Sequence, residues 1–180
     1  IAKKVEELNS NGDIEIVLTR DQDIYSHPKE KADFNKEKNA DLFISIHIDG
    51  SPKPNTKSGL HIWVAKNQYA NATQSKMLAS ALINEFTGNY PLPVASAPMQ
   101  RVQGIWTLQA NDIPSVLIEA GYITNETDVA YLKTDAAKET IAKNVLAAIE
   151  KYLTRKSITP ATIIRDTVPT VITADIAAMN

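Results

Sequence analysis

A histidine and a glutamate, each at the end of an apolar run, are the residues of this chain best suited to chemistry. Residues 42–46 lead into His47, and residues 116–118 lead into Glu119. Open α/β sheets carry their chemistry at the carboxyl ends of strands, so we expect the two side chains to meet there. Neutral imidazole is a common zinc ligand, and a carboxylate can take a proton from a metal-bound water. The pair therefore predicts a metal ligand and its general base.

Each of these residues also has a structural interpretation. His47 could simply hydrogen-bond a loop, and Glu119 could lie just beyond the buried strand, in water. An ionised carboxylate beside an apolar strand is costly unless it is paired or bound to a metal. Burial raises the pKa of such a group and a nearby cation lowers it, and the sequence leaves that balance open. For His61, which alternates with apolar residues, and for His27, in a polar loop, we expect surface or packing roles.

The composition indicates one globular domain. The 180 residues are enough for one well-buried core, and the 43% apolar and 22% charged residues are typical of a soluble protein. The net charge of −2 gives no basic footprint for nucleic acid or anionic lipid. No apolar run is long enough to cross a bilayer. The absence of cysteine excludes disulfides, thiolate catalysis and Cys-based zinc sites.

Strand-like and helix-like segments alternate along the chain. This alternation predicts an α/β layered domain with a largely parallel sheet. We expect the loops at 50–56 and 90–104 to contact a substrate, because loops at a strand-end crevice carry specificity. We expect strands at 14–19, 42–47, 60–65, 105–108 and 115–119, and helices at 1–8, 29–38, 71–87, 129–132 and from 135 onward.

Both ends of the chain differ from a complete domain of this kind. Residues 1–8 have the pattern of the back half of an amphipathic helix, so we expect residues 1–153 to form a domain that lacks its first strand and the start of its first helix. A neighbouring strand would then have an unpaired edge. Residues 154–180 contain six Thr, two Pro and no helical stripe, which predicts a linker or the truncated start of a further segment.

Several motifs in succession resemble those of the zinc-dependent N-acetylmuramoyl-L-alanine amidases, the Amidase_3 family of bacterial cell-wall hydrolases. The resemblance covers residues 1–153. It rests on residues 40–47 and 114–125, on Ser58 and Gly59, on residues 17–20, and more loosely on Lys31 and Asn35.

The resemblance implies a three-layer α/β/α sandwich around a mostly parallel twisted sheet. It also implies that a zinc-activated water cleaves the amide between the lactyl group of N-acetylmuramic acid and L-Ala of the stem peptide in peptidoglycan. His47 matches one of the family's zinc ligands, and Glu119 matches its catalytic glutamate. The substrate implies a periplasmic or cell-wall location. It leaves open whether a protein activator is involved.

The chain departs from the family pattern at several positions. The family's His-Gly-Gly segment and its first-helix glutamate, which supply the other zinc ligands, are absent here, and we expect them upstream of Ile1. Asp49 stands where the family has Asn, and Tyr122 where it has Phe. With one zinc ligand of three, the parent protein is expected to be an amidase and this segment alone to be inactive. A catalytically inactive cell-wall-binding or regulatory homologue is the alternative, and an unrelated α/β domain is a third.

Overall fold

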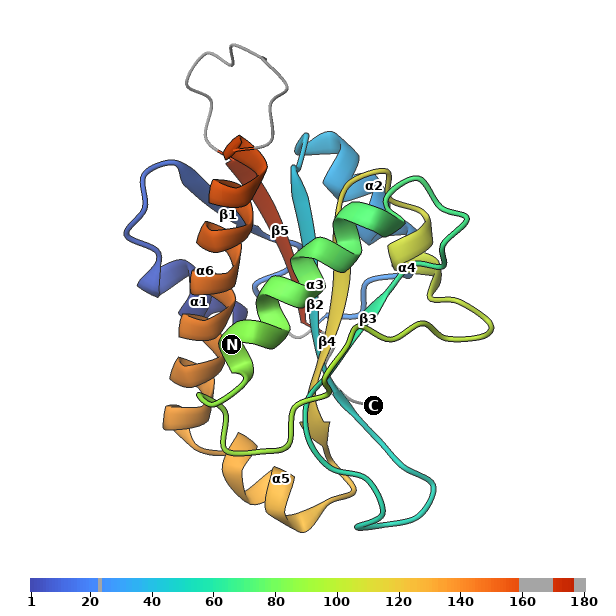
Figure 1. Cartoon of the computed structure of the whole chain (residues 1–180), viewed down its shortest axis with the longest axis vertical. Coiled ribbons are helices and arrows are strands. Elements are labelled where there is room, and N and C mark those ends of the chain that lie inside the picture. The colour runs from blue at the N-terminus through green and yellow to red at the C-terminus, as the bar shows by residue number, and fades with distance from the viewer. Residues whose placement is uncertain (23, 159–169, 177–180) are drawn as a thin grey trace.

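A single mixed sheet organises the chain in the computed structural model, which describes residues 1–22, 24–158 and 170–176 (Figure 1). Within these residues the strand order is β1-β5-β2-β4-β3. The pairs β1·β5, β5·β2 and β2·β4 are parallel, and β3 pairs antiparallel with β4, so the expected mostly parallel sheet is confirmed. The strands are β1 (Ile14–Leu18), β2 (Leu42–Asp49), β3 (His61–Val64), β4 (Ser115–Tyr122) and β5 (Thr170–Ile176).

Helices cover both faces of this sheet, which makes the predicted three layers. Figure 1 shows α3 and α6 crossing the near face, where α1 also packs against α6, and α2 and α4 contact each other on the opposite face. The helices are α1 (Ala2–Leu8), α2 (Pro28–Glu37), α3 (Ala72–Phe86), α4 (Trp106–Gln109), α5 (Glu126–Leu132) and α6 (Asp135–Ile158).

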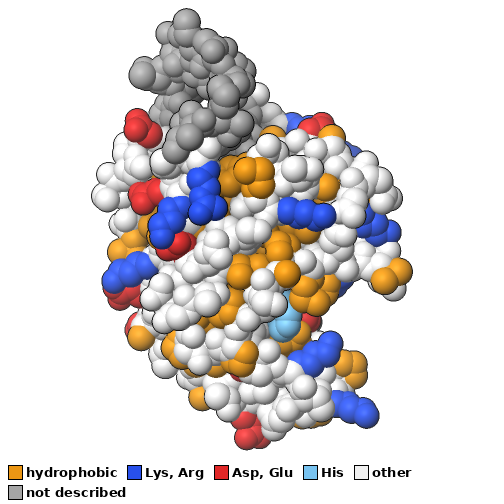
Figure 2. All heavy atoms as spheres, in the orientation of Figure 1, with side chains coloured by type: hydrophobic (Ala, Val, Ile, Leu, Met, Phe, Trp, Pro, Cys, Tyr) orange, Lys and Arg blue, Asp and Glu red, His pale blue; other side chains and the backbone are white. Residues whose placement is uncertain are grey.

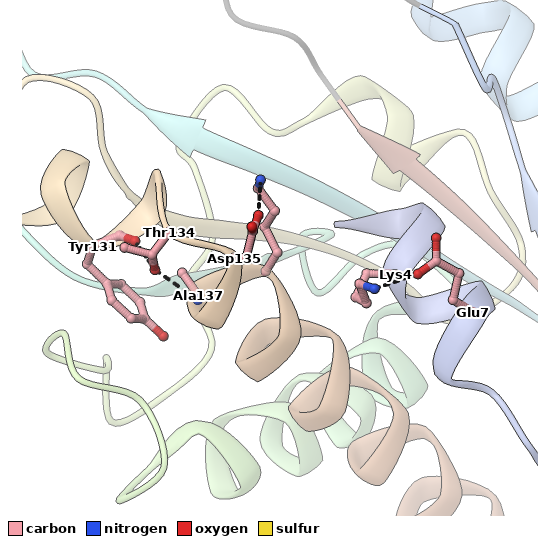
Figure 3. Close-up of polar contacts among 7 residues, drawn as sticks. Lys4, Glu7, Tyr131, Thr134, Asp135 and Ala137 are labelled. Atoms are coloured by element: carbon pink, nitrogen blue, oxygen red, sulfur yellow. Dashed lines mark hydrogen bonds and ion pairs between the residues drawn. The ribbon is translucent and has the colours of Figure 1, made fainter.

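Polar side chains fix where several helices begin. The His27 imidazole accepts a hydrogen bond from the Lys29 backbone N–H at the start of α2, and Pro28 stands at the first helical position, where its missing N–H costs nothing. The Thr134 hydroxyl accepts from the Ala137 N–H at 3.1 Å at the start of α6 (Figure 3). Asn125 likewise accepts from the second and third residues of α5. His27 therefore has the structural role expected of it.

The central strands bury side chains on both of their faces. In β2, Leu42, Ile44 and Ile46 enter the core shared with α1, α3 and α6, whereas Phe43 packs with Leu108 of α4 on the other face. β4 repeats this alternation, since Val116 and Ile118 join the first core and Leu117 the second. The period of two in a strand therefore places His47 and Glu119 on the face that carries Phe43 and Leu117.

The prediction of a linker over 154–180 is wrong for the part that the structure describes. Helix α6 continues to Ile158, and β5 lies inside the sheet between β1 and β2. The Thr-rich composition suits a strand, because β-branched residues pack well on a pleated surface. The strand edge that we expected to be unpaired is therefore covered by β5. Residues 159–169 and 177–180 lie outside the described residues.

The prediction of a strand at residues 105–108 is also wrong. Residues Trp106–Gln109 form the helical turn α4, which buries Leu108 beneath the sheet. The outer edge of the β3 region is paired instead with the loop that precedes α4, through the single bridges Leu60↔Val94 and Trp63↔Met99. The sequence could not reveal this because a segment of four residues is too short for its pattern to distinguish a strand from a helical turn.

We predict that Ile172→Ala in β5 lowers the free energy of unfolding by about 2–5 kcal/mol, as expected for a fully buried aliphatic side chain. Ile172 is 2% exposed and pairs in register with Ile16 and Leu42. Denaturant unfolding measures the loss. Ile24→Ala is the matched control, since Ile24 is 56% exposed. Equal effects of the two substitutions would show that β5 does not lie in the sheet in solution.

Candidate active site

His47 and Glu119 are direct neighbours across the centre of the sheet. Their Cα atoms are register partners in the parallel pair β2·β4, and both side chains extend from the same face. The expected meeting of the two residues at the strand ends is therefore confirmed, while their catalytic roles stay predictions. His61, at the start of β3, is the register partner of Glu119 on its other side. Because β3 runs antiparallel, its first residue reaches the same edge of the sheet.

A β-bulge in β4 directly follows Glu119. Between the pairs His47↔Glu119 and Asp49↔Tyr122, β2 advances by two residues (49 − 47) and β4 by three (122 − 119). The extra residue turns Tyr122 onto the same face as Asp49, and bulges of this kind commonly re-aim side chains next to active sites. Burial, followed by the charges of Asp49 and Glu119, raises the pKa of Tyr122 to about 12.

The two positions at which the chain departs from the family pattern are thus in contact with each other. A phenol in place of Phe provides a donor, and a carboxylate in place of Asn provides the acceptor. Asp49 and Tyr122 are register partners after the bulge, so the two groups lie side by side. Sequence reasoning treated Asp49 and Tyr122 as separate differences, because only the bulge brings them onto one face.

Glu119 is a buried carboxylate with one unsatisfied oxygen. The residue is 4% exposed, and Oε2 has no hydrogen-bond partner within the described part of the chain. Burial, together with the charge of Asp49, raises the pKa of Glu119 from 4.5 to about 7, while Arg101 acts in the opposite direction. The sequence left open whether burial or a nearby cation controls the pKa of Glu119, and in the structure the effect of burial exceeds that of Arg101. A carboxylate with a pKa near neutrality can both accept and return a proton at neutral pH.

A cavity of about 640 Å³ opens beside these residues. Figure 2 shows this side of the molecule as a hollow at the right-hand edge, with basic side chains on its lower lip. Both loops expected to contact a substrate contribute to the lining, although contact itself stays a prediction. The lining residues are Asp49, Gly50, Thr56, Lys57, Ser58, His61, Trp63, Met99, Arg101 and Tyr122.

Sequence reasoning missed Arg101 and Trp63. Arg101 Nη2 lies 3.7 Å from Glu119 Oε1, and the guanidinium lies over the Trp63 ring, 4.9 Å from its centroid. Arg101 belongs to an irregular loop and Trp63 to a strand on the far side of Glu119. No local pattern connects them, so only the tertiary structure could identify this cluster.

Asp128 anchors the loop that forms one wall of the cavity. Its buried carboxylate accepts hydrogen bonds from Ser58 Oγ (2.6 Å) and from the backbone N–H groups of Gly59 and Tyr122 (both 2.9 Å). Gly59 has φ +91°, and a Cβ there would overlap the Pro93 carbonyl oxygen, so only glycine fits. The Ser-Gly motif noted in the sequence therefore positions the loop.

The remaining candidate positions have structural roles. His61 packs edge-on against Tyr122, with ring centroids 5.7 Å apart, and it also lines the cavity. Lys31 and Asn35 are buried in α2, and Asn35 Nδ2 donates to Asn111 Oδ1 at 3.1 Å. This contact connects α2 to the segment after α4. Asn35 therefore has a structural role, joining α2 to the segment that precedes β4.

The described residues do not by themselves fit a catalytic zinc. His47 Nε2 lies 2.8 Å from Ser45 Oγ, and the side chains that the structure describes include no group of three His, Asp or Glu able to hold a metal. A catalytic zinc normally takes three protein ligands. His47 can supply one of them, so zinc at this position would require ligands from beyond the described residues.

We expect Glu119→Gln to stabilise the fold at alkaline pH. The native carboxyl binds its proton more tightly than the unfolded one, so the stability of the parent falls as pH rises from about 4.5 to about 7. The loss is about 3 kcal/mol when complete. Denaturant unfolding at pH 4 and pH 8 should show that Glu119→Gln gains stability mainly at pH 8. Glu150→Gln, on the exposed side of α6, is the control, and an equal gain at both pH values would contradict the assignment.

We also expect the 180-residue chain to bind less than one zinc per molecule at micromolar metal. The reason is that one imidazole does not hold zinc at useful affinity. Equilibrium dialysis with elemental analysis measures the stoichiometry. One tightly bound zinc per chain, lost in His47→Ala, would refute the conclusion that the described ligands are insufficient.

Comparison with known proteins agrees with the motifs and the fold. The chain is 24% identical to the amidase AmiC of Escherichia coli O6:H1, across 84% of this chain but 45% of AmiC, so it spans less than half of that relative. It is 26% identical to a putative N-acetylmuramoyl-L-alanine amidase of Buchnera aphidicola, across 87% of this chain and 84% of the relative. The catalytic domain of the amidase CwlV from Bacillus (Paenibacillus) polymyxa superposes with a TM-score of 0.75 at 25% identity, covering 85% of this chain and 80% of that domain. The family model described as N-acetylmuramoyl-L-alanine amidase matches residues 1–151, and the chain therefore belongs to this family, Amidase_3.

Proposed function

We propose that this chain is the catalytic part of a peptidoglycan hydrolase that cleaves the amide between the lactyl group of N-acetylmuramic acid and L-Ala of the stem peptide. The observation that carries the proposal is the His47–Glu119 pair, which lies near the carboxyl ends of two neighbouring buried strands, beside an open cavity. Family membership agrees with this reaction. Peptidoglycan as the substrate implies action in the periplasm or at the cell wall. No helix in the described part of the chain is long and apolar enough to span a membrane.

Glu119 is the proposed general base. Its carboxylate accepts a proton from the water that attacks the amide carbonyl and returns it to the departing L-Ala nitrogen. The same group can do both because its pKa of about 7 leaves the charged and neutral forms similarly populated at neutral pH. Burial supplies this property, since 4% exposure keeps bulk water from stabilising the charge.

His47 is the proposed protein ligand of a catalytic Zn²⁺. Zinc, when bound, polarises a carbonyl and lowers the pKa of a coordinated water. Because the described residues hold no group of three ligands, the chain is not expected to hydrolyse peptidoglycan without additional ligands. We therefore propose that the activity belongs to a protein in which this ligand set is complete.

A second candidate function follows from the same ligand count. A homologue that binds the cell wall or regulates a partner hydrolase needs the cavity but no metal centre. The open cavity of about 640 Å³, with Lys57, Trp63 and Arg101 in its lining, is the observation that favours this alternative. Such a protein would be retained by peptidoglycan without releasing new amino termini.

Incubation of purified peptidoglycan with a protein that contains this chain and the complete ligand set separates the two functions. An amidase exposes new N-terminal L-Ala residues, which amine labelling counts, and a chelator should abolish their release. Glu119→Gln should lose on the order of 10²–10⁴-fold in rate, as expected when a positioned general base is removed. The control is Glu150→Gln. Release that survives both the chelator and Glu119→Gln would refute the mechanism, and retention of the protein without release would support the binding function.

A further inference from the structure

The Arg101 guanidinium is an exposed cation beside the buried carboxylate of Glu119. Nη2 lies 3.7 Å from Glu119 Oε1, and the side chain of Arg101 is 43% exposed whereas that of Glu119 is 6% exposed. Arg101 also lines the 640 Å³ cavity. The guanidinium therefore touches both the proposed base and the space in which a substrate would lie.

The contact with Glu119 leaves most of the guanidinium donors available. A separation of 3.7 Å is longer than a hydrogen bond, and none of the hydrogen bonds between described residues uses the Arg101 side chain. A guanidinium carries five N–H donors in a planar fork, which matches the two oxygens of a carboxylate. Most N–H donors of the Arg101 guanidinium are therefore available to a ligand in the cavity.

Trp63 restricts the orientation of this fork. The guanidinium carbon lies 4.9 Å from the ring centroid, a separation at which a cation is attracted to the face of an aromatic ring. An arginine that is already oriented loses less entropy when it binds a ligand. Lys57 lines the same cavity as a second cation, and Asp49 is the one carboxylate among the residues that line it. The cavity is therefore suited to a ligand that carries a negative charge.

We propose that Arg101 is a specificity-determining residue that binds a carboxylate of an acidic stem peptide through a bidentate charge-assisted pair. This inference rests on the proposed function, because it assumes that the stem peptide enters the cavity. An extended residue spans about 3.3–3.6 Å. Because Arg101 Nη2 lies 3.7 Å from Glu119 Oε1, a carboxylate bound by this guanidinium belongs to a residue within about one or two positions of the scissile amide.

A different role for Arg101 makes a different prediction. If Arg101 served only to orient Glu119, its replacement would affect acidic and amidated peptides equally, because neither peptide would touch the guanidinium. If Arg101 binds the carboxylate, amidation of the peptide removes the group that Arg101 contacts, so the acidic peptide binds more tightly than the amide. Replacement of Arg101 should then abolish this preference. The ratio of the two affinities therefore distinguishes the two roles.

The experiment measures peptide binding by tryptophan fluorescence of the 180-residue chain. Trp63 and Trp106 are its two tryptophans, so Trp106→Phe leaves Trp63, beneath Arg101, as the sole reporter. The probes are two dipeptides whose γ-carboxyl is blocked as a methylamide, as the next peptide bond blocks it in a stem peptide. L-Ala-D-Glu γ-methylamide keeps a free α-carboxylate, and L-Ala-D-isoglutamine γ-methylamide has an amide in its place. In this background we expect the acid to bind at least about tenfold more tightly, equivalent to about 1.4 kcal/mol.

Substitutions of Arg101 complete the test. Arg101→Gln should bind both probes with equal affinity, and Arg101→Lys should keep only part of the preference because an ammonium lacks the planar fork. Arg20→Gln, beyond the end of β1, is the matched control and should keep the full preference. The inference is overturned if the protein with Arg101 intact binds the acid and the amide equally, or binds neither. It is also overturned if Arg101→Gln still prefers the acid.

These outcomes are separate from those for the proposed function. Equal binding of the two probes removes the specificity role of Arg101 and leaves amidase activity unaffected. A clear preference for the acid, with no release of L-Ala termini by a protein with a complete ligand set, would support the carboxylate site and refute the amidase. Because binding is the readout, the test does not depend on metal.

Discussion

The parallel pairing of β2 with β4 is the interaction on which the rest of the site depends. Ile44, Ile46, Val116 and Ile118 fix the pairing, because these side chains fill the core beneath α3 and α6. Given that packing, the period of two in a strand places His47 opposite Glu119 on the other face. A slip of one residue would exchange the two faces of a strand and place its polar group in the apolar core. The same packing that stabilises the sheet therefore sets the geometry of the proposed chemistry.

Asp128 and Glu119 are two buried carboxylates near this end of the sheet, and they show how the surroundings of a residue decide its role. Asp128 accepts three hydrogen bonds and joins the β2–β3 loop to the end of β4, so it serves as a structural anchor. Glu119 is similarly buried, yet Oε2 has no partner among the described residues and the neighbouring Asp49 raises its pKa further. An unsatisfied buried carboxylate costs stability, a cost that is commonly tolerated at functional sites.

Strand β5 supports the site from the other side of β2. It pairs with β2 through Leu42↔Ile172 and with β1 through Ile14↔Thr170, and β1 joins the sheet through β5. A seven-residue strand far along the chain therefore connects the first strand to the centre of the sheet. Contacts between residues so distant in sequence form only after a large loss of chain entropy, and they need burial on both faces to offset it.

The sequence by itself determined the type of fold, the positions of most helices and strands, and the His47–Glu119 pair, because each depends on a local hydrophobic period or on a residue that ends an apolar run. It also predicted that the loops at 50–56 and 90–104 lie at the site. Only the tertiary structure decided the neighbours of that pair. The bulge that joins Asp49 to Tyr122, the position of Arg101 over Trp63 and the insertion of β5 all arise from contacts between segments distant in sequence. No local pattern encodes such contacts, because they depend on which surfaces are buried together once the sheet has formed.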